Sequence, residues 1–218
     1  MRQGHCGAGL RLMHMWDQHA FADWGVASKS IDWSQQEGRL MEDTSLRGAS
    51  PNTLLEDIAL GFVSGNLDDF PVPDRLDILG LDFSVQSLGL IDRYLEEVRQ
   101  HFSRKRLKGQ SIYDAVPASS EYVLLLRLGA YLGEVIRKHS TNTVEWITHA
   151  DVLRLSADYA VWLGDKPTLS TAFALQNTNI GLTMPLNKVF KFLVNGSEDS
   201  LESYARVAIG KNIESLPR

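Results

Sequence analysis

Apolar residues recur every three or four positions in two early segments of the chain, and this spacing predicts amphipathic helices. The first helix begins at Ser50-Pro51, where a proline has no useful N–H to lose, and ends at Gly65-Asn66. The second covers residues 82–106, with Ser84 as its N-cap. Its apolar stripe consists of Val85, Leu88, Ile91, Leu95, Val98 and Phe102.

Residues 121–139 are apolar nearly all round, which is typical of a helix at the centre of a fold. We interpret Gly129 and Gly133 as packing glycines, because glycine weakens a helix by about 1 kcal/mol relative to alanine. Glu134 follows directly, and a buried carboxylate needs a partner. It either makes a structural hydrogen bond or ion pair, with Arg137, Lys138 or a lysine from the next region, or acts as a general base or a ligand contact.

After Thr141-Asn142 the pattern changes to short β-branched and aromatic runs separated by turns. Three runs predict strands, at 144–147, 159–163 and 169–175. Residues 164–167, Gly-Asp-Lys-Pro, are typical of a hairpin connection between the last two. Residues 151–158 fit either a helical turn or an irregular strand.

The chain ends in two predicted helices. Pro185 opens the first and Asn195-Gly196 closes it, while Ser197 caps the second, with Glu198 and Asp199 in its first turn. The predicted fold class is therefore α+β. It has a helical amino-terminal part with a central apolar helix, a small antiparallel sheet and two closing helices.

Three segments resemble an uncharacterised bacterial domain family of unknown function: LDFSVQSLGLIDRYLEEVR (81–99), LGAYLGEVIRK (128–138) and PLNKVFKFLVNGSEDSLESY (185–204). The family's members share a D-x-S-x-x-S-L helix, a G-x-Y-x-G-E-V helix and a P-x-x-K-V-x-K-x-x-x-N-G-x-x-D-S-L ending. The resemblance covers residues 81–210 and implies a common fold for that core. It implies no substrate, cofactor or site residue.

Composition narrows the class of protein. The 218 residues are 44% hydrophobic and 22% charged, as in ordinary globular domains, and their net charge of −5 gives no reason to expect a nucleic acid partner. The longest apolar stretch, 122–136, is interrupted by Arg127 and Glu134, so we expect no membrane span. A single cysteine fits a reducing compartment, and we expect a cytoplasmic protein of bacterial type.

The first 40 residues differ from the rest, because they hold three tryptophans, three histidines and the one cysteine: Trp16, Trp24, Trp33, His5, His14, His19 and Cys6. The spacing of these possible ligands matches no zinc template, so we expect no metal. Lacking apolar periodicity, residues 1–40 are expected to be a poorly ordered, dispensable extension, or to reflect a mis-assigned start upstream of Met41. Residues 41–218 are then expected to form a single α+β domain.

Acidic residues gather in the stretch 56–92, where eight carboxylates face one basic residue, Arg75. Pro71 and Pro73 predict an extended connection there, because the residue before a proline avoids the α region. We expect such a segment to leave its carboxylates exposed, so it is either an ordinary solvated face or a surface that steers a basic partner. The candidate partner-binding residues are Asp68, Asp69, Asp74 and Asp77.

The chain lacks the familiar catalytic motifs, among them a G-x-S-x-G elbow, an H-E-x-x-H pair and a P-loop, and we expect no cofactor. These observations favour a non-catalytic intracellular binding protein of immunity or adaptor type, with an acidic surface for a basic protein partner. The alternative is a small enzyme of unknown reaction, with Glu134 as acid or base, supported by Lys188, Asn195 or Asp199. The oligomeric state stays open.

Overall fold

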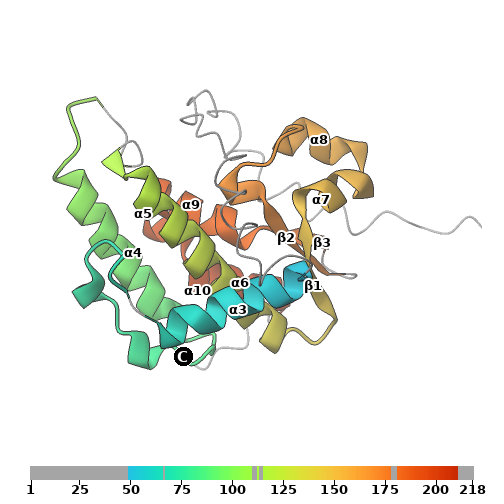
Figure 1. The fold of residues 1–218 in the computed structure, drawn as a ribbon, viewed down its shortest axis with the longest axis horizontal. Coiled ribbons are helices and arrows are strands. Elements are labelled where there is room, and N and C mark those ends of the chain that lie inside the picture. The colour runs from blue at the N-terminus through green and yellow to red at the C-terminus, as the bar shows by residue number, and fades with distance from the viewer. Residues whose placement is uncertain (1–48, 66, 110–111, 113–114, 178–180, 211–218) are drawn as a thin grey trace, which may run out of the picture.

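The protein is described by a computed structural model, which covers residues 49–65, 67–109, 112, 115–177 and 181–210. The fold is α+β, as the sequence predicted: helices surround a central helix, and a small antiparallel sheet lies at one side (Figure 1). The residues predicted to form an amino-terminal extension, 1–40, lie outside the described part of the chain. The α-helices are α3 (Pro51–Ser64), α4 (Leu88–Ser103), α5 (Ala118–Val123), α6 (Gly129–His139), α7 (His149–Leu155), α8 (Ala157–Leu163), α9 (Pro185–Asn195) and α10 (Leu201–Ala208).

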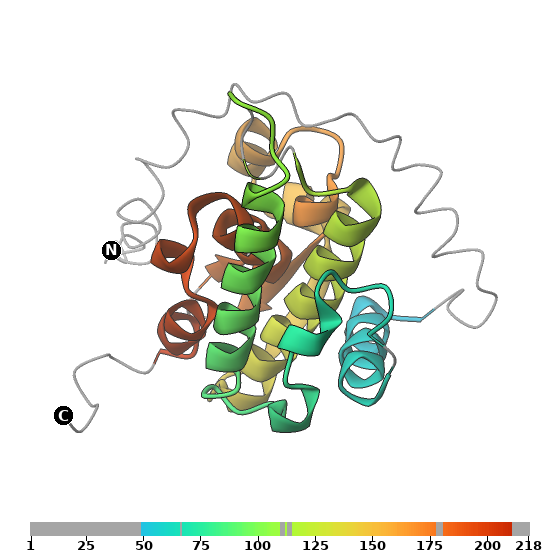
Figure 2. The same cartoon turned by 90° about the vertical axis from the view of Figure 1, so that its left-hand side faces the viewer.

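The central helix runs from α5 through a single π-helical segment, η4 (Leu124–Leu128), into α6. Every residue from Gly129 to Ile136 is buried, which confirms the position that its apolar circumference predicted. Figure 2 shows α4 running alongside this helix, and α3 at the edge of the same group. α3, α9 and α10 also pack against α6.

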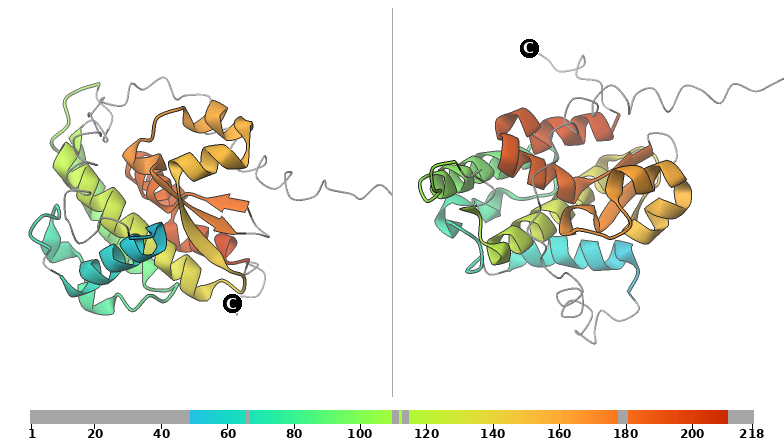
Figure 3. Two further views of the ribbon diagram at one scale, coloured as in Figure 1. Left: turned by 45° about the vertical axis from the view of Figure 1, so that its right-hand side comes forward. Right: turned by 90° about the horizontal axis from the view of Figure 1, so that it is seen from above.

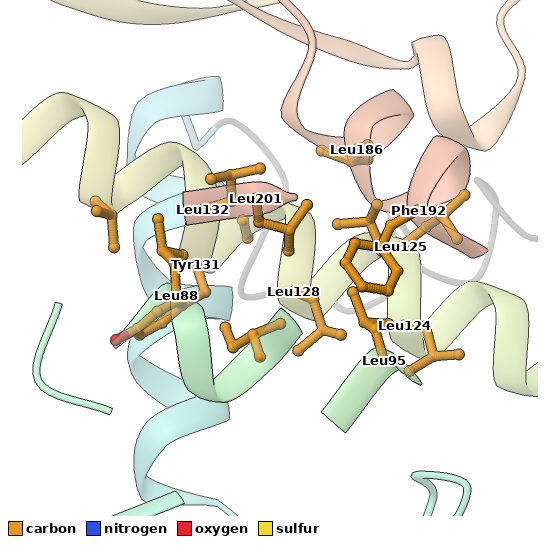
Figure 4. Close-up of a cluster of buried hydrophobic side chains, with 14 of the residues drawn as sticks. Leu88, Leu95, Leu124, Leu125, Leu128, Tyr131, Leu132, Leu186, Phe192 and Leu201 are labelled. Carbon is orange, nitrogen blue, oxygen red and sulfur yellow. The ribbon is translucent and has the colours of Figure 1, made fainter. Parts of the chain in front are cut away.

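The hydrophobic core lies where α4, the central helix, α9 and α10 meet (Figure 4). Leucines of η4 and α6 contribute from the middle, and α9 and α10 add the side chains on the other side. Burying side chains of this size gives roughly 1.5–3 kcal/mol each, which makes this junction the main source of stability. The labelled members are Leu88, Leu95, Leu124, Leu125, Leu128, Tyr131, Leu132, Leu186, Phe192 and Leu201.

The sheet has the order β1-β2-β3, with both pairs antiparallel. Its strands are β1 (Val144–Thr148), β2 (Phe173–Asn177) and β3 (Gly181–Thr183). Along β1 the buried Val144 and Trp146 alternate with the exposed Glu145, the pattern of a strand with one face on the core. Trp146 pairs with Leu175 at the middle of β2.

Both predicted packing glycines lie at close contacts of the central helix. A Cβ on Gly129 would come within 2.8 Å of Cγ of Leu186, and a Cβ on Gly133 would overlap the indole ring of Trp146. The helix therefore approaches α9 at one glycine and the sheet at the other, which confirms the interpretation of both residues.

The predicted helix 82–106 is shorter than its apolar spacing suggested, because α4 begins at Leu88 and ends at Ser103. Phe83 has φ +61°, a left-handed conformation that no α-helix contains. Its backbone N–H donates to the hydroxyl of Tyr131 over 2.9 Å, and its ring stacks on Tyr131 with centroids 4.7 Å apart. Ser84 therefore caps a turn before the helix, where its hydroxyl accepts from the N–H of Ser87.

The prediction of a strand at 159–163 was wrong, and with it the hairpin at 164–167, because α7 and α8 occupy this region. Thr148 and Asp151 form a reciprocal capping box that begins α7, and the Ser156 hydroxyl accepts from the N–H of Asp158 to begin α8. These caps outweigh the weak strand preference of a short aromatic run. The predicted strand 169–175 begins as a 3-10 turn, η5 (Leu169–Thr171), before β2, and β3 was not predicted.

Two further predictions need correction. The connection around Pro71 and Pro73 is compact rather than extended: it contains the 3-10 turns η1 (Pro73–Arg75) and η2 (Ile78–Gly80). The last helix, α10, starts after a further 3-10 turn, η6 (Ser197–Asp199), so that Ser200 rather than Ser197 caps it. In both places residues that the sequence pattern assigned to an extended connection or to the helix itself form short 3-10 turns.

We predict that Gly133→Ala destabilises the protein by about 1–3 kcal/mol, because the added methyl group overpacks the contact with Trp146. The matched control is Gly61→Ala in α3, where an added Cβ meets nothing within 4 Å. That substitution is expected to stabilise the protein by up to about 1 kcal/mol through helix propensity. Urea denaturation of the two variants measures both effects. If the two substitutions changed the free energy of unfolding equally, the close contact between α6 and β1 would be contradicted.

Candidate functional site

Glu134, the candidate acid or base, is buried in α6 with 2% of its surface exposed. Its Oε1 accepts a hydrogen bond from Nε1 of Trp146 at 2.8 Å and another from Nη1 of Arg137 at 2.6 Å. Arg137 in turn donates from Nε to the carbonyl oxygen of Val144 at 3.3 Å. The carboxylate therefore joins the central helix to β1, and the ion pair with Arg137 that the sequence suggested is present.

The three residues proposed to support Glu134 form a cluster of their own between α9 and η6. Nζ of Lys188 lies 2.5 Å from Oδ1 of Asp199, and Nδ2 of Asn195 donates to Oδ2 of the same carboxylate at 2.6 Å. Lys188 also lies 5.4 Å from the ring centroid of Tyr204. None of the hydrogen bonds or ion pairs found between described residues joins this cluster to Glu134.

The end of α9 is fixed by Arg99 of α4. Its guanidinium donates to the carbonyl oxygens of Leu193 at 3.2 Å and Val194 at 3.4 Å, which no helical N–H can satisfy. Gly196 follows with φ +85°, and a Cβ there would overlap the guanidinium group. The Asn-Gly pair therefore ends the helix and makes room for a cation at its negative end.

Asp92, also on α4, caps α10. Its carboxylate accepts from the Ser200 hydroxyl at 2.7 Å, from the N–H of Leu201 at 2.8 Å and from the N–H of Glu202 at 3.4 Å. Burial raises the pKa of Asp92 above its ordinary value, and these three hydrogen bonds oppose the rise. Asp92 is thus part of the packing of α4 against α10 and not part of an exposed acidic surface.

The other candidate residues lie together in one segment, residues 67–80, which we call the acidic loop. All four partner-binding candidates are exposed there: Asp68, Asp69, Asp74 and Asp77. Two of them lie near arginines on the surface, Asp74 at 3.6 Å from Arg75 and Asp69 at 3.9 Å from Arg127. Such exposed ion pairs contribute at most about 1 kcal/mol and leave carboxylate oxygens available to other partners.

Three contacts hold the backbone of the acidic loop. Phe70 is buried and stacks on Phe62 of α3, with centroids 5.4 Å apart. The Tyr94 hydroxyl of α4 donates to the carbonyl oxygen of Pro71 at 2.5 Å, and burial raises the pKa of this phenol well above its ordinary range. Leu76, buried to 6% exposure, holds the far side of the loop.

The sequence did not single out Leu79, which is 95% exposed in the same loop. No periodic pattern includes it, and the only signal for it is a large apolar residue between turn residues in an acidic stretch. A single exposed leucine is common on protein surfaces, so Leu79 draws attention only because four exposed carboxylates share its loop.

The sequence also missed a second cluster, around Phe83. Its carbonyl oxygen lies 3.0 Å from Nε2 of His139, and Nζ of Lys138 lies 3.5 Å above its ring. The Tyr131 hydroxyl, which accepts from Phe83, is also 2.6 Å from the Ser87 hydroxyl. These contacts hold the turn between the acidic loop and α4, so the D-x-S-x-x-S and G-x-Y segments of the predicted family motifs meet in space.

Within the described residues, no group of three or more His, Cys, Asp or Glu side chains could hold a metal ion. No described helix has the length and apolar character needed to cross a membrane. No protein-family model matches the chain, and no curated protein or solved structure matches it significantly. The resemblance to an uncharacterised bacterial family stays a prediction.

We predict that Asp92 gives the protein a pH dependence of distinctive sign. With a folded pKa above the ordinary 3.8, the folded state binds more protons than the unfolded state between the two values. The free energy of unfolding, relative to that of Asp92→Asn, therefore falls as pH rises through this window and is constant above it. Urea denaturation of both proteins at a series of pH values measures the difference, and a rise with pH would contradict the buried cap.

Proposed function

We propose that this chain is a non-catalytic intracellular binding protein, of the immunity or adaptor kind, and that the acidic loop docks a basic protein partner. The observation that carries the proposal is the combination in one loop of four exposed carboxylates and a leucine that is 95% exposed. Such a surface fits a partner with Lys or Arg side chains around a small apolar pocket.

The charge of the acidic loop is separated from the main basic segment of the chain. Arg104, Lys105, Arg106 and Lys108 are exposed beyond the carboxyl end of α4, whereas the acidic loop lies beside the amino-terminal half of this helix (Figure 2). Tyr94, which contacts the loop, precedes Arg104 by ten residues, or about 15 Å of helix, which is about twice the screening length of about 8 Å at physiological ionic strength. A basic partner that approaches the loop therefore meets an attraction that the basic segment does not cancel.

The fixed backbone of the loop also supports a binding role. Phe70 and Leu76 are buried, Pro71 accepts from Tyr94, and Val72 holds the unusual left-handed φ of +46°. A β-branched residue in this conformation costs free energy that the surrounding contacts must offset. Because the loop is already ordered, binding loses little conformational entropy at the contact surface.

The contacts of the enzyme candidates favour binding over catalysis. Glu134 accepts from two donors that belong to the helix–sheet junction, and Asp199 pairs with Lys188 and Asn195 in a separate cluster. To act as a general base, Glu134 would have to give up the hydrogen bond from the buried indole of Trp146, which costs about 1–3 kcal/mol. The clustering of Glu134 with two of the supporting residues, which would favour an enzyme, is not among the described contacts.

The test uses two variants with the same change in net charge. One replaces Asp68, Asp69, Asp74 and Asp77 by Asn. The other removes four exposed carboxylates elsewhere through Asp57→Asn, Glu97→Gln, Glu145→Gln and Glu198→Gln. The partner is the protein that the wild-type chain retains from a cell extract.

Association and dissociation rates are then measured with that purified partner at two ionic strengths. We predict that the variant with four Asn residues in the acidic loop associates at least tenfold more slowly, with a flatter salt dependence. The variant with four changes elsewhere should associate almost normally. Leu79→Ala is expected to speed dissociation, and Glu134→Gln to lower stability without changing association. If both four-residue variants associated at the same rate, the acidic loop would be an ordinary solvated face and the proposal would be wrong.

A further inference from the structure

His149 is a buried titratable residue that the proposed function does not use. It is the first residue of α7, and 4% of its surface is exposed. Both views of Figure 3 show α7 and α8, coloured yellow-orange, at the periphery of the molecule, and α7 packs against β1 and β2. Histidine is the side chain whose charge changes near neutral pH, so the surroundings of this ring decide whether pH alters this part of the fold.

Both ring nitrogens of His149 face carbonyl oxygens of the main chain. Nδ1 lies 3.2 Å from the oxygen of Thr171 in η5, and Nε2 lies 3.1 Å from the oxygen of Gly164, which follows α8. A carbonyl oxygen only accepts hydrogen bonds, and a neutral imidazole has a single N–H to donate. Both contacts are therefore hydrogen bonds only when the ring is protonated and carries an N–H on each nitrogen.

The two contacts differ in how deeply they are buried. The contact with Thr171 is buried, whereas the contact with Gly164 is partly open to solvent, and Gly164 itself is exposed. A carbonyl oxygen without a donor costs more free energy when it is buried, because near solvent a water molecule replaces the missing donor. A neutral ring therefore keeps its proton on Nδ1 for Thr171 and loses the hydrogen bond to Gly164.

α8 depends on the contacts at its ends. It has seven residues, and none of its side chains whose exposure is described is buried. A helix this short is marginal on its own. At its start the Ser156 hydroxyl accepts from the N–H of Asp158, and at its end the N–H of Gly164 donates to the carbonyl oxygen of Ala160. The contact between His149 and Gly164 ties that end to the start of α7.

The charged groups on the elements around His149 do not pair with it. The elements η5 and β2 carry none, and the others carry Asp151 and Arg154 on α7, Asp158 on α8, Asp165 and Lys166 after α8, and Glu145 on β1. No ion pair between described residues includes His149. Hydrogen bonds from Thr148 hold the pKa of Asp151 below its ordinary value, so this nearest carboxylate in the chain stays ionised where a histidine changes charge.

We propose that His149 is a pH-sensitive switch that fixes the end of α8. While the ring is protonated, both N–H groups donate, and the imidazole ties Gly164 and Thr171 to the start of α7. When the ring loses its proton, the Nδ1–H keeps Thr171, and the lone pair of Nε2 faces the carbonyl oxygen of Gly164, which repels it. α8 is therefore held more firmly at low pH and opens more often as the pH rises.

The experiment follows the ring and the helix of the full chain between about pH 5 and pH 8. NMR spectra of the imidazole nitrogens give the protonation state of His149. Hydrogen exchange, corrected for the intrinsic effect of pH, gives the protection of the amides of α8. We expect this protection to fall about fivefold as the ring loses its proton, because one hydrogen bond is lost. A ring that keeps one charge state throughout, or an α8 whose protection stays constant while the ring titrates, overturns the proposal.

Two variants that each remove one histidine separate the ring from other effects of pH. His149→Asn places an amide near the position of Nδ1, where it can donate to Thr171 but does not reach Gly164. We expect α8 in this variant to keep the low protection of the high-pH wild type at every pH. The matched control, His101→Asn, removes a partly exposed histidine from the last turn of α4 and should keep the wild-type pH dependence.

A pH dependence of α8 that survives in His149→Asn overturns the proposal. If this variant fails to fold, the pH series of the wild-type chain decides the question alone, because it follows the ring and the helix in one protein. The variants that test the acidic loop leave His149 unchanged, so the switch and the docking surface hold or fail separately.

Discussion

The contact between Gly133 and Trp146 holds the two halves of this fold together. The missing side chain of the glycine lets the indole lie directly on the central helix, and the next residue, Glu134, accepts the indole N–H. Arg137, one turn further on, neutralises the carboxylate and also donates to β1 through Val144. A buried carboxylate without these partners would cost several kcal/mol, so the sheet and the helix depend on each other.

This dependence has a consequence for function, because it uses the polar residues that looked most suited to chemistry. Glu134 belongs to the helix–sheet junction and Asp199 to the cluster between α9 and η6, while Asp92, from the acidic stretch, caps α10. The four aspartates of the acidic loop, by contrast, stay exposed at the surface. The acidic loop combines these charges with the exposed Leu79, which favours a protein as its ligand.

The sequence predicted the parts of the fold that repeat a simple pattern. The all-round apolar character of 121–139 located the central helix, and the glycine spacing within it located two close contacts. The sequence failed where a distant residue decides the local structure. Phe83 leaves the helical region because Tyr131 binds its N–H from 48 positions away, and the start of α10 depends on Asp92, more than 100 residues earlier.

The candidate site residues divide in the same way, into those that a local pattern predicts and those that a distant contact decides. The exposure of Asp68 and its three neighbours could be predicted from composition, since charged residues in a proline-containing loop rarely become buried. The partner of Glu134 on its own helix, Arg137, could also be predicted from spacing. The contact of Trp146 with Glu134 and the exposure of Leu79 could not be predicted, because both depend on which side chains the folded chain covers. The caps of α7 and α8 could be recognised in the sequence only after residues 159–163 were known to be helical.

A double-mutant cycle between Glu134 and Trp146 tests the central claim most directly. Glu134→Gln removes the charge, Trp146→Phe removes the indole N–H while keeping an aromatic ring, and the third protein carries both changes. Their free energies of unfolding are compared with that of the wild type by urea denaturation. The hydrogen bond of 2.8 Å between them predicts a coupling of about 1 kcal/mol or more. Effects of the two substitutions that simply add would contradict the helix–sheet junction described for this protein.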